Sequence, residues 1–399
     1  MPNSFGRVLR GTLLISGTTI GGGVLGLPVL TSLGGFVPAM VMFFLCWAFM
    51  TATGLLALEA YMWQKGDPNL VTMSENTLGR PGKIFTWAIY IFFFYCLSVA
   101  YTLGCGKLVV AVSGGTLPSE WGPIVFTALF APLVYAGAKV IGRLNVFLMV
   151  GLIGFYFIFV FLGVPYVNTE NLEHTNWLMS LKAMPIAFAS FGFHGIVPTL
   201  GRYLNKNLRD CRIAIIVGSL IPLIAYITWD WLILGIVPLE GEGGLREALA
   251  LGNTAVEPLK QVLNNPNIYI VGQCFAFFAL VTSFLGVTLG LRDFLADGLG
   301  IEKDAKGRIA ACVMIFVPVL MISATYPHIF LVALDYAGGF GASLLLGLLP
   351  ILMVWSGRYH LHLPKQESAL PGGRFLLSIL ICFVAVELIT ETLQLFQKI

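Results

Sequence analysis

The run Gly21-Gly22-Gly23, inside an otherwise apolar stretch, could bind an anion with its backbone. Glycine lowers helix stability by about 1 kcal/mol per residue relative to alanine, so this run favours an unwound segment. The N–H groups that it exposes, next to the positive end of the following helix, suit a carboxylate. The alternative is close helix packing, because Gly17-xxx-Gly21 and Gly22-xxx-Gly26 both fit a small-xxx-small pattern.

A second stretch of the same character reads Ser190-Phe191-Gly192-Phe193-His194-Gly195, with Pro198 three residues later. Its glycines and proline interrupt an apolar helix, and His194 brings an ionisable ring into it. Taken alone, such a histidine is more often structural than a ligand. Unwound backbone inside a membrane is tolerated only where it is buried in protein or lines a polar cavity. Both stretches are therefore candidates for a polar site within a membrane.

The elements that carry these stretches must cross a membrane, because the chain is too apolar for a water-soluble fold. Of its 399 residues, 57% are hydrophobic and 11% are charged, against about 25% charged in an ordinary soluble domain. This composition excludes a soluble enzyme, a disordered protein and a nucleic-acid binder, and a net charge of +3 indicates no acidic partner. Apolar runs long enough to span the hydrocarbon core predict eleven helices, at 8–31, 36–63, 84–112, 121–138, 144–166, 179–200, 211–237, 267–297, 308–325, 328–355 and 374–396.

The two interrupted stretches lie in the first and sixth predicted spans, five spans apart. An odd offset turns the second copy upside down in the membrane. Interrupted segments at matching places in inverted halves indicate the substrate site of a transporter. We therefore expect one transmembrane transporter domain over 1–399, with a first repeat at 8–166, a second repeat at 179–355 and an extra helix at 374–396.

Basic residues predict the orientation of these spans. With a cytoplasmic N-terminus, 18 of the 23 Lys and Arg residues lie on the cytoplasmic side, where such residues concentrate. The five on the other side are Lys107, Lys182, Arg246, Lys260 and Lys398. We expect a multi-pass protein of a bacterial inner membrane with a periplasmic C-terminus, whose partners are the lipid bilayer and a small-molecule substrate. The sequence does not indicate an oligomeric state.

Three strings together resemble bacterial aromatic amino acid permeases, most of all the tyrosine-specific transport proteins. They are Gly17 to Pro28, Ser190 to Gly195, and Thr282-Ser283-Phe284-Leu285-Gly286 running into residues 291–297. The resemblance covers about residues 8 to 395. It implies an all-α integral membrane protein of the amino acid/polyamine/organocation superfamily, with a LeuT-type five-plus-five inverted repeat, an eleventh helix, and breaks in helices 1 and 6. It also implies secondary active import of aromatic amino acids by ion symport and alternating access, with tyrosine first and tryptophan or phenylalanine as alternatives.

The resemblance also implies a role for each substrate-site residue. Backbone N–H groups of Gly21, Gly22 and Gly23 would hold the substrate carboxylate. Carbonyls near Thr18 and Thr19, and those at Ser190 and Phe191, would hold the ammonium group. The side-chain pocket would draw on Phe191, Phe193 and His194, next to Gly192. Further candidates are Tyr95 and Tyr101 from the third span and Phe278 from the eighth. For any single aromatic residue, packing or lipid contact is the alternative.

Many LeuT-type proteins hold a sodium ion between the first and eighth helices. The matching groups here would be carbonyls of Gly17, Ile20 and Ala279 and hydroxyls of Thr282 and Ser283. Relatives that use protons can carry a lysine on the fifth helix, whereas this chain has no charged side chain between Arg143 and Glu170. We therefore favour sodium as the coupling ion, with a proton as the alternative. We expect no cofactor and no metal beyond that sodium.

Five ionisable residues lie within apolar spans, where such groups are costly and commonly functional: Glu59, Asp230, Asp335, Glu387 and His194. Glu59 lies close enough to a span end to snorkel, and Asp230 lies near the outer interface between two tryptophans. Asp335, beside a Gly-Gly pair, and His194 are the candidate proton carriers.

An intramembrane enzyme is the main alternative class, and a transporter of a different small amino acid is another. The strings Gly-x-Ser-Gly and His-Glu-x-x-His and a pair of membrane aspartates do not occur. Lys83 and Lys107 follow glycines but lack the Ser or Thr that a phosphate loop requires next. We therefore expect no catalytic residue.

Overall fold

The computed structural model of the chain describes residues 4–66, 68–114, 116–263, 265–302, 304–364 and 370–398, and every regular element in these ranges is a helix. In the first half the elements are α1 (Ser4–Thr19), η1 (Gly22–Leu25), α2 (Leu27–Thr31), α3 (Phe36–Met62), α4 (Leu70–Val112), η2 (Ser119–Trp121), α5 (Gly122–Ala136), α6 (Ala138–Gly163), η3 (Val164–Tyr166) and η4 (Thr169–Leu172). In the second half they are α7 (Trp177–Ser180), η5 (Leu181–Ala183), α8 (Met184–Ser190), η6 (His194–Ile196), α9 (Val197–Tyr203), α10 (Leu208–Ile236), α11 (Leu245–Ala250), α12 (Leu259–Val262), α13 (Pro266–Leu299), α14 (Ala305–Thr325), α15 (Phe330–Tyr336), η7 (Ala337–Leu348), α16 (Leu349–Tyr359) and α17 (Gly373–Lys398).

Nine helical segments of the described chain are long and apolar enough to cross a membrane, and the bent pair Phe5–Thr19 and Gly22–Thr31 adds a tenth. The remaining predicted span corresponds to α5, which has 15 residues and is therefore about 23 Å long. The chain is thus a multi-pass membrane protein. Two basic residues used for the orientation, Lys303 and Lys365, lie outside the described residues, as does the side chain of Lys398.

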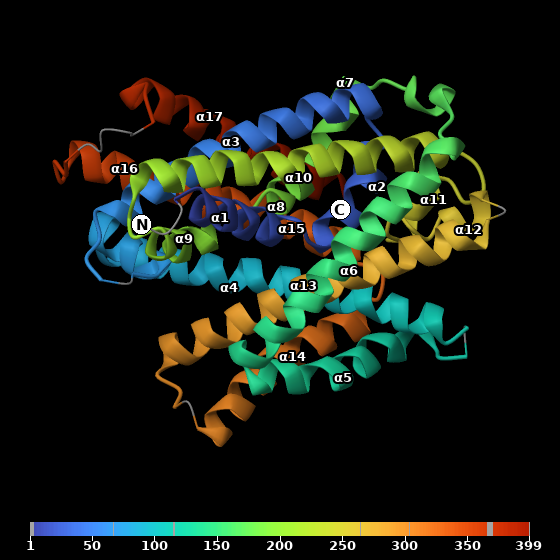
Figure 1. Cartoon of the computed structure of the whole chain (residues 1–399), viewed down its shortest axis with the longest axis horizontal. Coiled ribbons are helices and arrows are strands. Elements are labelled where there is room, and N and C mark those ends of the chain that lie inside the picture. The colour runs from blue at the N-terminus through green and yellow to red at the C-terminus, as the bar shows by residue number, and fades with distance from the viewer. Residues whose placement is uncertain are drawn as a thin grey trace.

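The interior of the bundle is formed by the spans that contain irregular backbone. The most apolar part of Phe330–Tyr359 is 78% buried and that of Trp177–Tyr203 is 67% buried, against 22% for Ala138–Tyr166. In Figure 1, α1, α8 and α15 lie in the middle of the bundle, with α3 and α10 above them and α5 and α14 below. Helix α10 packs along α1, and α13 packs along α6. The central segments are therefore enclosed by long regular helices.

The first span bends at its glycines. Helix α1 ends at Thr19, Ile20 and Gly21 are not helical, and the segment Gly22–Thr31 leaves at 47° to α1. Gly21 is extended, with φ −149° and ψ −163°. Helix α2 then begins with Pro28 in its first turn, where the missing N–H has no helix partner to lose. The glycine run and the proline thus coincide with the change of direction.

The sixth span is irregular at residues 191–193, between the end of α8 at Ser190 and the start of η6 at His194. Helix α9 follows with Pro198 in its first turn. Both spans therefore present the carbonyl end of one helix and the N–H end of another inside the bundle.

The tenth span contains a π-helix, η7, between two α-helical pieces. Within it the Ser343 hydroxyl donates to the carbonyl of Gly338, five residues earlier, at 3.2 Å. Gly338 lies so close to the Pro185 carbonyl of α8 that a Cβ would overlap it. The sequence analysis did not predict this π-helix, although π-helical turns are common at functional sites.

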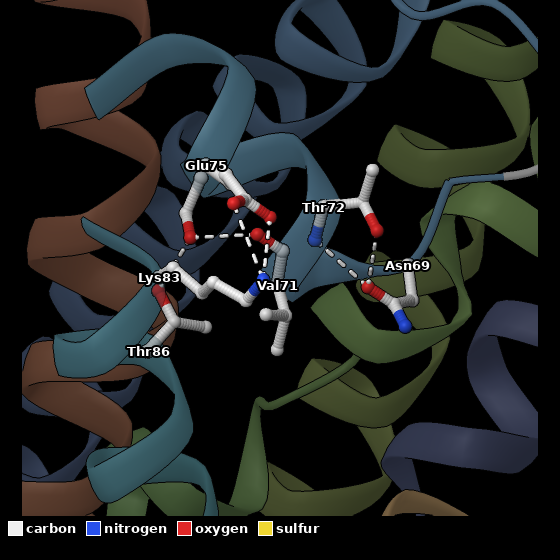
Figure 2. Close-up of polar contacts among 7 residues, drawn as sticks. Asn69, Val71, Thr72, Glu75, Lys83 and Thr86 are labelled. Carbon is white, nitrogen blue, oxygen red and sulfur yellow. Dashed lines mark hydrogen bonds and ion pairs between the residues drawn. The ribbon is translucent and has the colours of Figure 1, made fainter. Parts of the chain in front are cut away.

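The third span begins earlier than predicted, because α4 continues N-terminal to residue 84 through a kink at Gly79 (φ 72°). Figure 2 shows the polar contacts that hold the two parts of α4 together. Lys83 pairs with Glu75 at 3.0 Å, and the Thr86 hydroxyl donates to the Ser74 hydroxyl at 2.9 Å. Asn69 caps the first turn by accepting from the Thr72 N–H at 2.8 Å. This first part of α4 is thus a capped, polar helix rather than membrane-spanning sequence.

Candidate functional site

The glycine run of the first span packs tightly against three other spans. The Gly22 N–H donates to the Ser283 hydroxyl of α13 at 2.7 Å. A Cβ on Gly22 would lie 2.7 Å from Cε1 of Tyr101 and 2.9 Å from Cδ2 of Leu280. A Cβ on Gly23 would lie 2.5 Å from the Ser190 hydroxyl of α8. The structure therefore brings together Gly22, Gly23, Tyr101, Ser190 and Ser283, and no side chain fits at the two glycines.

A residue that the sequence analysis missed joins the two interrupted spans. The Tyr226 hydroxyl of α10 lies 2.8 Å from the Thr19 carbonyl and 2.9 Å from the Ser190 carbonyl. These carbonyls are the last of α1 and α8, so each is at the negative end of a helix dipole. The hydroxyl has a single proton, which it can donate to either carbonyl. Two converging carbonyl ends of this kind suit a cation. In this structure the Tyr226 hydroxyl occupies the position between them as the hydrogen-bond donor.

His194 and the neighbouring aromatic rings face α3. The His194 Nε2 lies 2.9 Å from the Thr53 hydroxyl, and no partner of its buried Nδ1 is present in the described chain. The Phe193 ring stacks on His194 at 5.0 Å between centroids and covers Gly54. Phe191 packs edge-on against Tyr226 at 5.1 Å. The rings that the sequence analysis assigned to the side-chain pocket are therefore buried next to the irregular segment 191–193.

Two other aromatic candidates lie away from these segments. The Tyr95 hydroxyl donates to the Met314 carbonyl of α14 at 2.7 Å. Phe278 stacks on Phe155 of α6 at 5.5 Å and lies over Gly151. Tyr95 precedes Tyr101 by six residues, which is about 600° around a helix, so the two side chains leave α4 on different faces. The structure thus brings Tyr101, but not Tyr95 or Phe278, to the glycine run.

The two hydroxyls proposed for sodium point in different directions. Thr282 bonds within its own helix, to the carbonyls of Phe278 and Ala279 at 2.8 and 3.0 Å. Ser283 instead accepts from Gly22, and the Tyr101 hydroxyl is within hydrogen-bonding reach of it. The other groups of the proposed set are Gly17, whose α-carbon faces the terminal methyl of Met149, and Ile20, which lies in the irregular segment.

The candidate proton carrier Asp335 lies in a separate acidic cluster. It is 5% exposed on α15, where its charge acts on Glu387 of α17, as does that of Glu391. Glu391 lies over Gly339 of η7. Around this cluster, η7 and α17 pack against each other and against α8.

Two surface hollows of the described chain lie away from the interrupted segments. One, of about 270 Å³, is lined by charged residues of α13 and α14, including Arg292, Asp297 and Arg308. The other, of about 370 Å³, lies between Lys107, Glu257 and His328. The Lys107 ammonium donates to the Gly252 carbonyl at 2.5 Å. Burial raises the pKa of Glu257, and a hydrogen bond from Thr254 and the charge of Lys107 oppose that shift.

Comparison with known proteins decides the family. The model of the tryptophan/tyrosine permease family matches residues 5–391. The chain belongs to this family. The tyrosine-specific transport system 1 of Haemophilus influenzae is 32% identical over 390 residues, which cover 96% of each chain. The tryptophan-specific transport protein of the same organism is 27% identical over 400 residues, covering 96% of this chain and 95% of that relative.

A solved structure shows the fold that this permease shares. The crystal structure of MhsT in complex with L-phenylalanine matches with a TM-score of 0.58 at 15% identity, covering 98% of both chains. The permease therefore has the all-α LeuT-type fold that the sequence resemblance implies. As a member of a family of tyrosine and tryptophan permeases, it is a transport protein and not an enzyme.

Tyr226 is the polar residue of this permease site that sequence reasoning missed, whereas Asp230 was singled out and given only a structural role near the outer interface. They lie four residues apart on α10 and therefore on one face of this helix. This four-residue spacing is the feature of the sequence that could have indicated a shared polar face. Single polar residues in a span have ordinary structural explanations, and the partners of these two, in α1, α2 and α8, become visible only in the folded chain.

Proposed function

We propose that this permease imports an aromatic L-amino acid, tyrosine first, by symport with an ion and alternating access. The observation that carries the proposal is the meeting of two helix carbonyl ends, at Thr19 and Ser190, around one hydroxyl. A substrate ammonium that replaces the Tyr226 hydroxyl would find both acceptors in place. The N–H groups of Gly21, Gly22 and Gly23 would hold the carboxylate a short distance away, with Gly22 released from Ser283.

The substrate side chain would lie among the rings beside residues 191–193. Phe191, Phe193 and Tyr101 supply apolar surface, and the His194 Nδ1 has hydrogen-bonding capacity left for a polar ring substituent. Tyrosine carries such a hydroxyl, and tryptophan carries an indole N–H. Relatives named for tyrosine and for tryptophan transport support this substrate class.

The coupling ion has two candidates. Sodium would be held by the carbonyls of Gly17, Ile20 and Ala279 with Thr282 and Ser283, after both hydroxyls leave their present partners. A proton would need a buried carboxyl, and the described spans contain several. We also propose that the protein resides in a bacterial inner membrane with its N-terminus in the cytoplasm, as the distribution of basic residues supports.

Uptake of labelled tyrosine into proteoliposomes, under sodium and pH gradients imposed separately, tests this function. We expect saturable, concentrative uptake with counterflow, and competition by unlabelled tryptophan and phenylalanine. Absence of exchange for all three amino acids would refute the proposal. Accumulation under only one gradient identifies the ion.

A further inference from the structure

Asp230 is a completely buried carboxyl at the contact between α2 and α10. It is 0% exposed, and its Oδ1 lies 2.6 Å from the Thr31 hydroxyl at the end of α2. Its Oδ2 has no hydrogen-bond partner in the described part of the chain. The adjacent Trp229 packs between Phe159 and Phe275, at 4.9 and 4.7 Å. The carboxyl is therefore buried where α2 meets α10, and the residue beside it in the sequence belongs to a packed aromatic cluster.

The hydrogen bonds at Thr31 are consistent with a neutral acid. The Thr31 hydroxyl also lies 2.9 Å from the Leu27 carbonyl of its own helix. The hydroxyl donates to both acceptors with one proton, so it satisfies neither of them fully. A proton on the Asp230 carboxyl would supply the second hydrogen to this pair of contacts. A neutral acid also leaves its carbonyl oxygen unpaired at a smaller cost than a carboxylate would.

Within the described residues, no cation pairs with the Asp230 carboxyl. The titratable groups on elements that pack near this end of α10 or on α2 are Tyr226 on α10, Tyr156 on α6, Tyr166 on η3, Glu170 on η4, His174 before α7, Lys182 on η5, Arg246 and Glu247 on α11, Tyr269 and Cys274 on α13, and Cys46 on α3. None of them bonds to or pairs with the Asp230 carboxyl among the described residues, and Arg246 pairs with Glu240 instead. Burying an unpaired carboxylate in apolar surroundings is strongly unfavourable.

We propose that Asp230 is the proton-binding site of the permease, and that α2 closes against α10 only when this carboxyl is protonated. The inference rests on the proposed symport function and membrane orientation, in which α2 and this end of α10 face the periplasm. The step is a proton transfer from a hydronium ion of the external water to the carboxylate, in which one hydronium O–H bond breaks and one carboxyl O–H bond forms. The ionised form favours an arrangement in which α2 has moved away and water reaches the carboxyl.

The same helix connects this site to the proposed substrate site. Tyr226 lies one helical turn before Asp230 and binds the ends of α1 and α8, while Asp230 binds α2. Both pieces of the first span therefore contact one face of α10. A proton at Asp230 and a substrate at the interrupted segments would each favour the closed arrangement, which is the energetic requirement for coupling two ligands.

The test uses the full chain in proteoliposomes with the membrane potential clamped and labelled tyrosine as the probe. Wild type is expected to accumulate tyrosine under an inward proton gradient. Asp230→Asn is expected to lose this accumulation and to keep tyrosine counterflow, because asparagine imitates the neutral acid but cannot titrate. Accumulation by Asp230→Asn equal to that of wild type overturns the inference. So does wild-type accumulation that ignores the pH gradient, and that result leaves the transport function intact.

Thr31→Val keeps the proposal testable if Asp230→Asn does not reach the membrane. Loss of one hydrogen bond to the neutral acid is expected to move the midpoint of the external pH dependence of uptake about half to one pH unit lower. His174→Gln is the matched control, because His174 is an exposed titratable group next to α2 with its Nε2 3.1 Å from the Leu33 carbonyl. An unchanged midpoint in Thr31→Val, or a midpoint that moves only in His174→Gln, overturns the assignment. If wild type exchanges neither tyrosine, tryptophan nor phenylalanine, the transport function fails together with the inference.

Discussion

Tyr226 shows how one hydroxyl can join two interrupted helices. Removing it leaves the carbonyls of Thr19 and Ser190 buried without that donor. We expect Tyr226→Phe to lower the stability of the substrate-free protein by about 1–3 kcal/mol, measured by unfolding in detergent. A substrate ammonium would restore the lost hydrogen bonds. The stabilisation that tyrosine confers should therefore be larger in Tyr226→Phe than in wild type.

Tyr156→Phe is the matched control for that experiment. Tyr156 also donates to a backbone carbonyl of α10, that of Ala225 at 3.0 Å, but it does not bridge the interrupted spans. It should lower stability without changing the effect of tyrosine. If Tyr226→Phe instead weakens tyrosine binding, the hydroxyl contacts the substrate rather than standing in its place.

Gly22 tests whether the glycine run is a site or only a packing contact. Gly22→Ala places a Cβ 2.7 Å from the Tyr101 ring, and we expect overpacking of about 1–3 kcal/mol together with loss of tyrosine binding. Gly195→Ala is the control, because nothing lies within 4 Å of its Cβ. Thermal shift with and without tyrosine separates the two effects. Tyrosine binding of wild-type strength in Gly22→Ala contradicts the carboxylate assignment.

The residue types in the sequence predicted the interrupted segments of this site. Which side chains meet there depends on the directions in which they leave their helices. The glycine runs were visible because glycine and proline act on the local backbone. Ser283 and Thr282 are adjacent, so they leave α13 about 100° apart and cannot be assigned to one ligand without the packing of neighbouring spans. The same reason separates Tyr101 from Tyr95. Tyr226 was not predicted because its partners are 36 and 207 residues away.

Among the elements, the lengths of the apolar runs predicted where the spans lie. They did not predict the helix type or the kinks within a span. Each predicted segment is mainly helical, with irregular backbone at 20–21 and 191–193, but the π-helix η7 and the first part of α4 were not predicted. A π-helix depends on hydrogen bonds five residues apart, and its Gly-Gly pair also suits an α-helix that packs closely. The start of α4 is polar, so it gave no signal of membrane-spanning sequence.

The close packing of η7 on α8 predicts a severe effect of one methyl group. At Gly338 a Cβ would overlap the backbone carbonyl of Pro185, which a side-chain rearrangement cannot relieve. We expect Gly338→Ala to destabilise the protein by more than about 3 kcal/mol. At Gly347, in the same π-helix, a Cβ would lie 3.2 Å from Phe49 and 3.3 Å from Val384. Gly347→Ala should therefore be tolerated, and equal thermal stability of the two variants would contradict this packing argument.

At the scale of the whole molecule, one ion pair joins spans that are far apart in the sequence. Arg358 of α16 donates to both carboxylate oxygens of Glu59 on α3, at 2.8 and 2.5 Å. The side chains are 6% and 3% exposed. The sequence interpretation, in which Glu59 snorkels to the surface, is therefore wrong, because a partner 299 residues away keeps the carboxylate inside.

This pair is predicted to hold α3 against α16 and to lose that role when one partner is removed. Glu59→Gln leaves the Arg358 charge buried without its partner, which costs about 3–5 kcal/mol. The double variant Glu59→Leu with Arg358→Met removes both charges, so unfolding in detergent should show most of the stability restored. Tyrosine uptake then separates a purely structural pair from one that opens during transport. A structural pair leaves uptake by the double variant close to wild type, whereas a pair that must separate in each cycle changes the uptake rate although the fold is stable.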